Sequence, residues 1–285
     1  VSLATLAAPS TERTVRLAIT AMPPAKGHPY RNVATTANFV LPALYDTLVT
    51  FNNQGQVVPR LATHWENRDP LTWAFHLRHG VVFSNGEPLT AQGIATVWNA
   101  LRKGEAASYT LAREVEPFAA IAAENDHTLV IRLHEPNALL PQYLHTLYAA
   151  PEAYWAKVGW EGLADAPIGT GPFVIESWGL ESIAMRANPT SWRAPKIDKL
   201  TFRVAPEPTA RVQALLTGQV DAVIAVDPEQ ESVLVAEGLR VHQRKGMRIL
   251  CIALATTKPG SPMTDARVRR ALNHAVNKQR IVDAL

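Results

Sequence analysis

The chain has 285 residues, 47% of them hydrophobic, which is enough to bury a core in one large domain or two ordinary ones. Its net charge of +3 comes from basic residues scattered among acids, which disfavours a nucleic-acid partner, and no apolar run approaches the roughly 18 residues of a membrane span. The single cysteine, Cys251, cannot form an internal disulfide, and cysteine poverty fits a reducing cytosol and a secreted bacterial protein equally.

The first part of the chain predicts a leader, a strand, a loop and a helix. Residues 1–10 are small and apolar and resemble the tail of a secretory signal with its cleavage region, with a disordered terminus as the alternative. Residues 14–20 alternate with branched side chains and predict a strand, after which prolines open a loop to about Tyr30. Residues 32–49 are apolar enough to predict a helix interrupted by Pro42.

The next part predicts a small β-rich region with one helix. Residues 71–77 and 80–83 predict two short antiparallel strands that are followed by a turn at 84–88. Thr90 is a candidate N-cap for a helix that runs through Trp98 to Leu101. A further strand is predicted at 128–133.

The pattern changes after a glycine turn at 169–172. Three strands are predicted first, and then a helix, a strand and a second helix that Asp227, Pro228 and Gln230 begin as a capping box. The strands are predicted at 173–178, 182–186 and 199–204, the helix at 207–216 and the following strand at 222–225. Strands that alternate with helices predict an α/β layer with a largely parallel sheet.

The last part of the chain predicts two helices. Thr264 is a candidate cap for a helix through Ala275, and Asn277 is a candidate cap for a second helix that is still running at Leu285. Helices usually end at a glycine or a polar exit, so we expect the natural protein to continue beyond this residue.

Four motifs follow one another between residues 163 and 223. They read Ile-Gly-Thr-Gly-Pro-Phe at 168–173, Asn-Pro-Thr-Ser-Trp at 188–192, Pro-Thr-Ala-Arg at 208–211 and Leu-Leu-Thr-Gly-Gln-Val-Asp at 215–221. The Gly-Thr-Gly-Pro piece alone indicates only a tight turn. The ordered set resembles the extracellular solute-binding proteins of family 5, which serve peptide and nickel ABC importers.

The resemblance extends from about residue 14 to the C-terminus. Further segments that resemble the family's signatures are 44–49, 56–65, 72–78, 83–91 and 266–278. Among all these motifs, those at 83–88, 166–172 and 275–278 are most similar to the periplasmic nickel-binding branch. That branch holds a metal chelate with aromatic side chains and arginines, but segments 103–109 and 144–148 contain no arginine, so a peptide and a metal chelate both stay open as ligands.

The resemblance implies an α/β fold of the periplasmic-binding-protein-like type II class, the peptide/nickel class, with two hinged lobes around the ligand. Residues 1–45 and 160–260 would form lobe one, 46–159 an inserted α+β subdomain and 261–285 the start of lobe two, most of which is absent. Hinge closure requires ligand contacts with both lobes, so we expect weak ligand binding by this length of chain alone. We also expect its exposed cleft face to favour self-association.

The resemblance also suggests ligand-binding residues. Tyr109 lies where family members present an aromatic side chain to the ligand, and the other candidates flank the loop after the first strand, near the expected hinge. These predicted ligand contacts are Met22, Tyr30, Arg31, Asn38 and Tyr109, and the alternative for each is ordinary packing. Of the nine histidines, His28 is the best functional candidate because its loop should face the cleft. We expect the Gly169–Pro172 turn to shape the hinge side of the cleft more than to touch ligand.

The sequence gives little support for metal binding, for nucleophilic catalysis or for a nucleotide-binding loop. The histidines form no metal-ligand spacing, so neither a metal site nor a cofactor is predicted. Cys251 lies in an apolar, strand-like run, which indicates a buried structural thiol. Ser84 and Ser191 do not lie in a nucleophile elbow, and Gly169-Thr170-Gly171 lacks the third glycine and the lysine of nucleotide loops.

The leading hypothesis is therefore a non-enzymatic, substrate-binding component of an ABC importer. It would bind a short peptide or a nickel or other metal chelate noncovalently, in the periplasm or on the extracellular surface of the membrane, and deliver it to a membrane permease. The alternative is a regulatory or sensor protein that uses a solute-binding domain, and an intact precursor with or without a secretory signal would separate the two. A hydrolase is a third reading.

Overall fold

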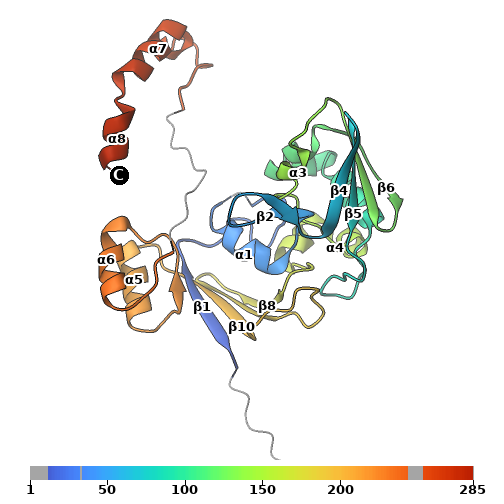
Figure 1. Cartoon of the computed structure of the whole chain (residues 1–285), viewed down its shortest axis with the longest axis horizontal. Helices are drawn as coiled ribbons and strands as arrows, with labels where there is room; N and C mark the ends of the chain where they lie inside the picture. The colour runs from blue at the N-terminus through green and yellow to red at the C-terminus, as the bar shows by residue number, and fades with distance from the viewer. Residues whose placement is uncertain (1–11, 33, 243–252, 285) are drawn as a thin grey trace, which may run out of the picture. The chain divides into compact units, whose positions relative to one another are not determined.

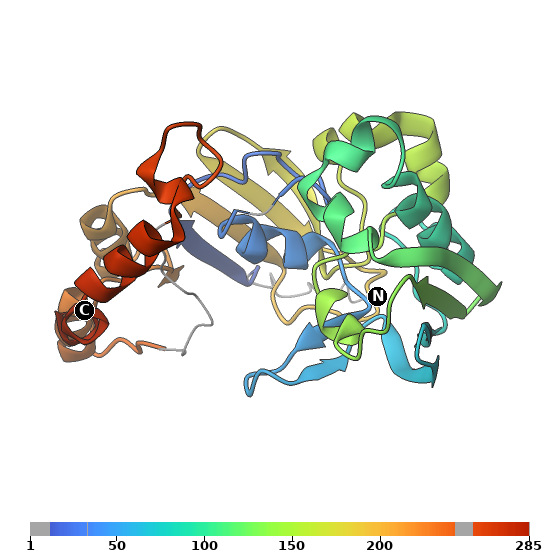
Figure 2. The ribbon, with the colours of Figure 1, turned by 90° about the horizontal axis from the view of Figure 1, so that it is seen from above.

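The computed structural model describes residues 12–32, 34–242 and 253–284, which belong to two compact units, 1–239 and 240–285 (Figure 1). The signal-like residues 1–10, the cysteine at 251 and the final leucine lie outside the described residues. The first unit contains two larger sheets, each with its own hydrophobic core cluster, and a separate two-stranded sheet. Both views show the blue and yellow strands of one sheet grouped apart from the teal and green strands of the other (Figure 2).

One sheet has five strands in the order β11-β1-β10-β9-β8. These strands are β1 (Thr14–Ile19), β8 (Phe173–Trp178), β9 (Ser182–Ala187), β10 (Lys199–Val204) and β11 (Ala222–Val223). β1 runs parallel to both of its neighbours, whereas β8, β9 and β10 pair antiparallel. The predicted strands are confirmed, but the expected largely parallel sheet is wrong. The sheet is mixed in part because only residues 179–181 join β8 to β9, and so short a connection can join only antiparallel strands.

Helices cover this sheet and fill its core. They are α1 (Ala37–Leu44), α5 (Pro208–Leu216) and α6 (Pro228–Ala236). α1 packs against β8, and α5 packs against β1 and β11. The helix predicted at 32–49 is shorter than expected, because the chain becomes extended at Tyr45, although Pro42 is accommodated inside it. Met185, Phe202 and Ile19 are buried in one hydrophobic cluster with side chains of α1.

The other sheet is antiparallel, with the strand order β4-β5-β7-β6. Its strands are β4 (Ala62–Asp69), β5 (Thr72–Leu77), β6 (Phe118–Asn125) and β7 (Thr128–Leu133). The predicted strand at 80–83 is wrong, because Val82 makes only an isolated bridge with Pro88. β5 pairs instead with β7 and with β4, and the sequence did not predict β4 because most of the side chains of β4 are polar and exposed. α2 (Ala91–Ala100) packs on β6 and β7, and it buries Trp98.

Shorter elements complete the first unit. They are the hairpin of β2 (Val49–Phe51) and β3 (Val57–Pro59), the 3-10 turns η1 (Gly104–Ser108) and η2 (Thr110–Val115), α3 (Leu140–Tyr143) and α4 (Glu152–Asp165). Thr90 caps α2 as predicted, with its Oγ1 accepting a hydrogen bond from Gly93 N at 3.0 Å. Asp227 makes no side-chain cap at α6, so the predicted capping box is wrong.

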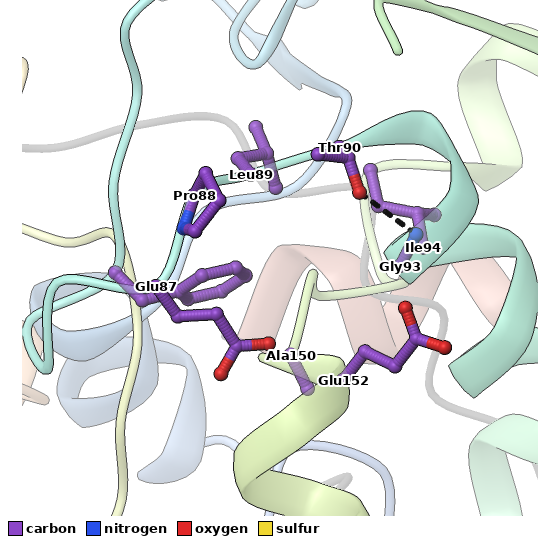
Figure 3. Close-up of a pocket in the computed structure, with 9 residues that line it drawn as sticks. Glu87, Pro88, Leu89, Thr90, Gly93, Ile94, Ala150 and Glu152 are labelled. Atoms are coloured by element: carbon purple, nitrogen blue, oxygen red, sulfur yellow. Dashed lines mark hydrogen bonds between the residues drawn. The ribbon is translucent and has the colours of Figure 1, made fainter. Parts of the chain in front are cut away.

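A carboxylate from the turn after β5 holds the start of α4. Glu87 accepts hydrogen bonds from Ala153 N at 2.7 Å and Tyr154 N at 3.2 Å, which satisfies free N–H groups of the first helical turn. Figure 3 shows Glu87 and Glu152 beside the capped start of α2, where they line a small cleft. The turn at 84–88 therefore ties α2 and α4 together.

Four of the segments that resemble the family, 44–49, 56–65, 168–173 and 188–192, meet at one buried carboxylate, that of Asp46. Oδ1 of Asp46 pairs with Arg60 Nε at 2.7 Å and Arg193 Nε at 2.8 Å, and its Oδ2 accepts from Thr170 Oγ1 at 2.9 Å and Trp192 Nε1 at 3.0 Å. The Asp46 side chain has no exposed surface. Burial lowers the pKa of Arg193, although Asp46 opposes this effect. A buried carboxylate needs such a complete set of partners.

The glycine turn before β8 packs directly against the end of α1. A Cβ atom on Gly169 would lie 2.0 Å from the Leu44 carbonyl oxygen, and one on Gly171 would lie 2.5 Å from the Leu44 carbonyl carbon. The N–H of Gly171 donates to the Leu44 oxygen at 2.9 Å. Both glycines are therefore required by this close approach of two backbone segments.

The second unit contains three short helical elements in its described residues. They are η3 (Pro262–Thr264), α7 (Ala266–Ala275) and α8 (Lys278–Ala284). Asp265 caps α7 by accepting from Arg267 N at 2.8 Å, so the predicted cap at Thr264 is wrong, since the Thr264 hydroxyl instead donates to the Ser261 oxygen. Asn277 caps α8 as predicted, with its Oδ1 accepting from Arg280 N at 3.0 Å.

Candidate functional site

The loop after β1 is held in shape by Asn32. Its Oδ1 accepts from Ala25 N at 3.0 Å, and its Nδ2 donates to the carbonyl oxygens of Lys26 at 2.8 Å and His28 at 3.0 Å. Gly27 packs so closely on Pro167 that a Cβ would lie 2.6 Å from the proline Cγ. These contacts fix the backbone from which His28, Tyr30 and Arg31 project.

His28 is buried and neutral. Its Nδ1 accepts a hydrogen bond from Tyr30 N at 3.1 Å, so the proton of the neutral ring lies on Nε2. No described residue forms a hydrogen bond with Nε2. Burial, together with a smaller effect of the positive charge of Arg31, lowers the pKa of His28 to about 4.

Aromatic rings surround this histidine. The Tyr109 ring meets His28 edge-on at 5.0 Å and Trp160 edge-on at 5.9 Å between centroids, and Tyr30 lies 5.7 Å from Trp160. Arg31 places its guanidinium carbon 5.3 Å from the Tyr109 ring centroid. The site is therefore an aromatic cluster with a cation on its accessible side.

A break in α4 positions the acidic partner of Arg31. Gly159 has φ 70° and ψ −170°, values that interrupt the helix and that glycine adopts readily. The residues after the break carry Trp160 and Glu161, and Glu161 forms an ion pair with Arg31. The side chains of Arg31 and Glu161 are 41% and 70% exposed, so this pair adds little stability and is available to solvent and solutes.

The structure brings three of the five predicted ligand contacts together. Arg31 and Tyr109 touch directly, and Tyr30 joins them through Trp160. The Tyr30 side chain is fully buried, and its hydroxyl donates to the Tyr148 carbonyl oxygen at 2.9 Å.

Met22 and Asn38 lie elsewhere. Met22 packs against the core of the five-stranded sheet, and Asn38 is exposed on the first turn of α1.

The sequence did not single out Trp160 and Glu161. Both follow an unremarkable helical pattern, and only Gly159 within that pattern signals that the helix breaks before them. The arrangement combines a largely buried aromatic cluster with an accessible cation and an exposed carboxylate, which suits noncovalent recognition of a solute. Within the described part of the chain, no group of three or more His, Cys, Asp and Glu side chains could hold a metal ion, and no helix has the length and apolar character to cross a bilayer.

Known proteins resemble this chain along most of its length. The model of the bacterial extracellular solute-binding proteins, family 5 Middle, matches residues 56–285. The nickel-binding periplasmic protein of Escherichia coli (strain K12) is 30% identical over 256 residues, covering 86% of this chain and 48% of the relative. A probable di/tripeptide-binding protein 5 of Pseudomonas aeruginosa (strain UCBPP-PA14) is 28% identical over 307 residues, covering 98% of this chain and 58% of the relative.

Solved structures show the same fold. The Haemophilus influenzae OppA complex with the peptide RPPGFSPFR superposes with a TM-score of 0.72 at 23% identity, covering 81% of this chain and 49% of that structure. The chain therefore has the predicted α/β type II periplasmic-binding-protein fold. It spans about half the length of the relatives and structures it matches. Because the family model matches most of the chain, in agreement with the motifs of the sequence, the chain belongs to the bacterial extracellular solute-binding proteins, family 5.

Proposed function

We propose that this protein is the substrate-binding component of an ABC importer and that it binds a short peptide or a nickel or other metal chelate noncovalently for transport. The observation that carries the proposal is the family match over residues 56–285. The relatives named for nickel binding and for di/tripeptide binding support the two ligand classes. The protein performs no covalent chemistry on its solute.

We further propose that residues 1–45 and 160–260 form lobe one, that 46–159 form the inserted subdomain and that 261–285 begin lobe two. The two larger sheets of the first unit support the first part of this division. The five-stranded sheet takes all its strands from 14–19 and 173–223, and the four-stranded sheet takes all its strands from 62–133. The two separate hydrophobic core clusters support the same division.

Arg31 and Tyr109 are the proposed solute contacts. Arg31 is accessible, and its ion-pair partner among the described residues is the exposed carboxylate of Glu161, so an anionic or carbonyl group of the solute can take the place of that carboxylate. Tyr30 has a different role, because its buried hydroxyl donates a hydrogen bond to the Tyr148 carbonyl oxygen. Its ring packs against Trp160 and supports the aromatic cluster. Met22 and Asn38 stay predicted contacts.

The proposed location is the periplasm or the extracellular surface of the membrane, and the proposed partner is the membrane permease of the importer. The family name itself, bacterial extracellular solute-binding proteins, supports this placement. Delivery to a permease requires that the solute be released unchanged, which noncovalent contacts with an exchangeable ion pair permit.

Native mass spectrometry of the protein purified from its own host tests the proposal. We expect a co-purified mass that is lost on denaturation. A peptide mass would exclude the metal chelate, and a nickel isotope pattern would exclude the peptide. Recovery of the protein free of both, together with its presence only in the cytoplasmic fraction, would overturn the transport proposal and favour a sensor.

A further inference from the structure

Two histidine side chains stack on one face of the four-stranded sheet. His64 on β4 and His76 on β5 are register partners, and their ring centroids lie 4.2 Å apart with planes 10° from parallel. Directly opposed residues of an antiparallel pair project to the same face, here the one opposite the buried Phe75. His64 is exposed and the His76 side chain keeps 28% of its surface accessible, so solvent reaches both rings.

Hydroxyl groups lie at the Nδ1 atom of both rings. The Thr63 hydroxyl has one proton, which it donates to the His76 carbonyl oxygen 3.1 Å away. It therefore accepts from His64 Nδ1 at 3.0 Å, so the neutral His64 ring carries a lone pair on Nε2. The Nδ1 of His76 faces the Thr128 hydroxyl at 3.4 Å. Metal-binding histidines are usually oriented in this way, by a hydrogen bond to the nitrogen that does not bind the metal.

The charges beside the rings favour a cation. Glu66 Oε1 lies 3.7 Å from His76 Nε2 and also accepts from Arg68 Nε at 3.0 Å. The hydrogen bond from Arg68 pairs this carboxylate with a cation on the same face of the sheet. Arg68 pairs with Glu124 as well, so two carboxylates and one guanidinium leave an excess negative charge near the imidazoles.

The contacts supply two imidazole ligands rather than a complete cage. Within the residues that the structure describes, no group of three or more His, Cys, Asp and Glu side chains already surrounds a metal position. Because the two rings stack, both Nε2 atoms can meet one ion only if the rings tilt toward each other about the Nδ1 atoms that the threonine hydroxyls hold, and water would fill the other positions of the ion. Neutral imidazoles prefer late first-row divalent ions and bind Cu²⁺ most strongly.

We propose that His64 and His76 form a two-imidazole binding site for a late first-row divalent metal ion on the exposed face of the four-stranded sheet. The site shares no residue with the aromatic cluster around His28 and does not depend on the proposed transport function. A second close pair, His79 and His127 with ring centroids 3.8 Å apart, provides a matched control. There His127 Nδ1 is buried and has no hydrogen-bond partner among the described residues, so the orienting contact is missing.

The test is calorimetric titration of the full chain with CuCl₂ in a non-coordinating buffer near neutral pH, with electron paramagnetic resonance of the copper-loaded protein. We expect nitrogen couplings from two imidazoles. His64→Gln and His76→Gln should each weaken the tightest copper binding by about tenfold or more. The double variant His79→Gln/His127→Gln should bind like the wild type.

Thermal melts followed by circular dichroism, without metal, confirm that each variant folds. The proposal is overturned if His64→Gln and His76→Gln, both folded, bind copper as tightly as the wild type. It is equally overturned if the tightest binding is lost in the His79→Gln/His127→Gln control.

Discussion

The carboxylate of Asp46 accepts a hydrogen bond from Arg193 Nε at 2.8 Å, across 147 positions of the sequence. Asp46 follows α1, and Arg193 follows the Asn-Pro-Thr-Ser-Trp motif, so the pair joins two of the segments that identify the family. Thr170 of the glycine turn binds the same carboxylate. Motifs that are distant in the sequence are thus parts of one buried polar junction, and their role here is structural.

Asp46→Asn should destabilise the first unit by about 3–5 kcal/mol, because it leaves two partly buried guanidinium groups without their counter-charge. Urea unfolding followed by tryptophan fluorescence measures the change. Asp221→Asn is the control, since Asp221 pairs with Arg16 where both side chains are 39% exposed, and it should change stability little. Equal losses in the two variants would contradict the central role of Asp46.

Gly169→Ala should also destabilise the first unit, by about 1–3 kcal/mol, because the added Cβ meets backbone that cannot move aside. The nearest atom is the Leu44 carbonyl oxygen, 2.0 Å away. Gly179→Ala is the matched control, because its Cβ would find its nearest neighbour at 3.5 Å. The two unfolding midpoints should therefore separate, and coincident midpoints would show that the glycine turn tolerates a side chain.

Side-chain caps allow a third comparison. Thr90→Ala removes the hydrogen bond to Gly93 N and should cost about 1 kcal/mol in the free energy of unfolding. Asp227→Ala should have little effect, because Asp227 caps α6 with no side-chain hydrogen bond. Chemical denaturation of both variants tests the pair, and a larger loss for Asp227→Ala would reverse the assignment.

The confirmed cap at Thr90 and the wrong one at Asp227 show that local sequence patterns predict only part of the fold. Alternation predicted β1, β5, β7, β8, β9 and β10, because each of these strands has one face against a core. It missed β4, whose polar residues extend over nearly its whole length, and it wrongly predicted a strand at 80–83, where Val82 makes only an isolated bridge with Pro88. The mixed sheet also escaped prediction, since strand direction is set by which strands become neighbours, and that information is not local.

The site was less predictable than the fold. The loop after β1 and Tyr109 could be proposed from resemblance, but their contact depends on Trp160 and Glu161, which come from a helix more than 45 residues further on. Only a three-dimensional arrangement reveals that Gly159 breaks α4 at this point. Likewise, no sequence pattern indicates that Tyr30 is buried and that its hydroxyl donates a hydrogen bond to the Tyr148 carbonyl oxygen.

The neutral state of His28 predicts a pH dependence of stability. Its pKa is about 4 in the folded protein against 6.5 for a free histidine, so between these values the unfolded chain binds a proton that the folded chain does not. The free energy of unfolding is therefore highest above pH 6.5, where both states leave His28 neutral. It falls by about 3 kcal/mol in all as the pH is lowered from 6.5 to 4. His28→Gln should flatten this part of the profile, measured as free energies of unfolding in urea.

An exposed histidine serves as the control for this profile. His134 is exposed on the same unit, so His134→Gln should keep the wild-type dependence on pH. A wild-type profile that is flat between pH 6.5 and 4, or one that His28→Gln leaves unchanged, would show that His28 is not held neutral by the fold.

Arg31 and Tyr109 provide the direct test of the proposed solute site. Arg31→Gln removes the accessible cation above the Tyr109 ring, and Tyr109→Ala removes the ring itself, so each should weaken binding of the solute recovered by native mass spectrometry by about tenfold or more. Isothermal titration calorimetry measures the affinities. Arg13→Gln is the control, because Arg13 is an exposed arginine paired with Asp198 just before β1. Wild-type affinity in both site variants, with normal thermal melts, would place the solute contacts elsewhere in the fold.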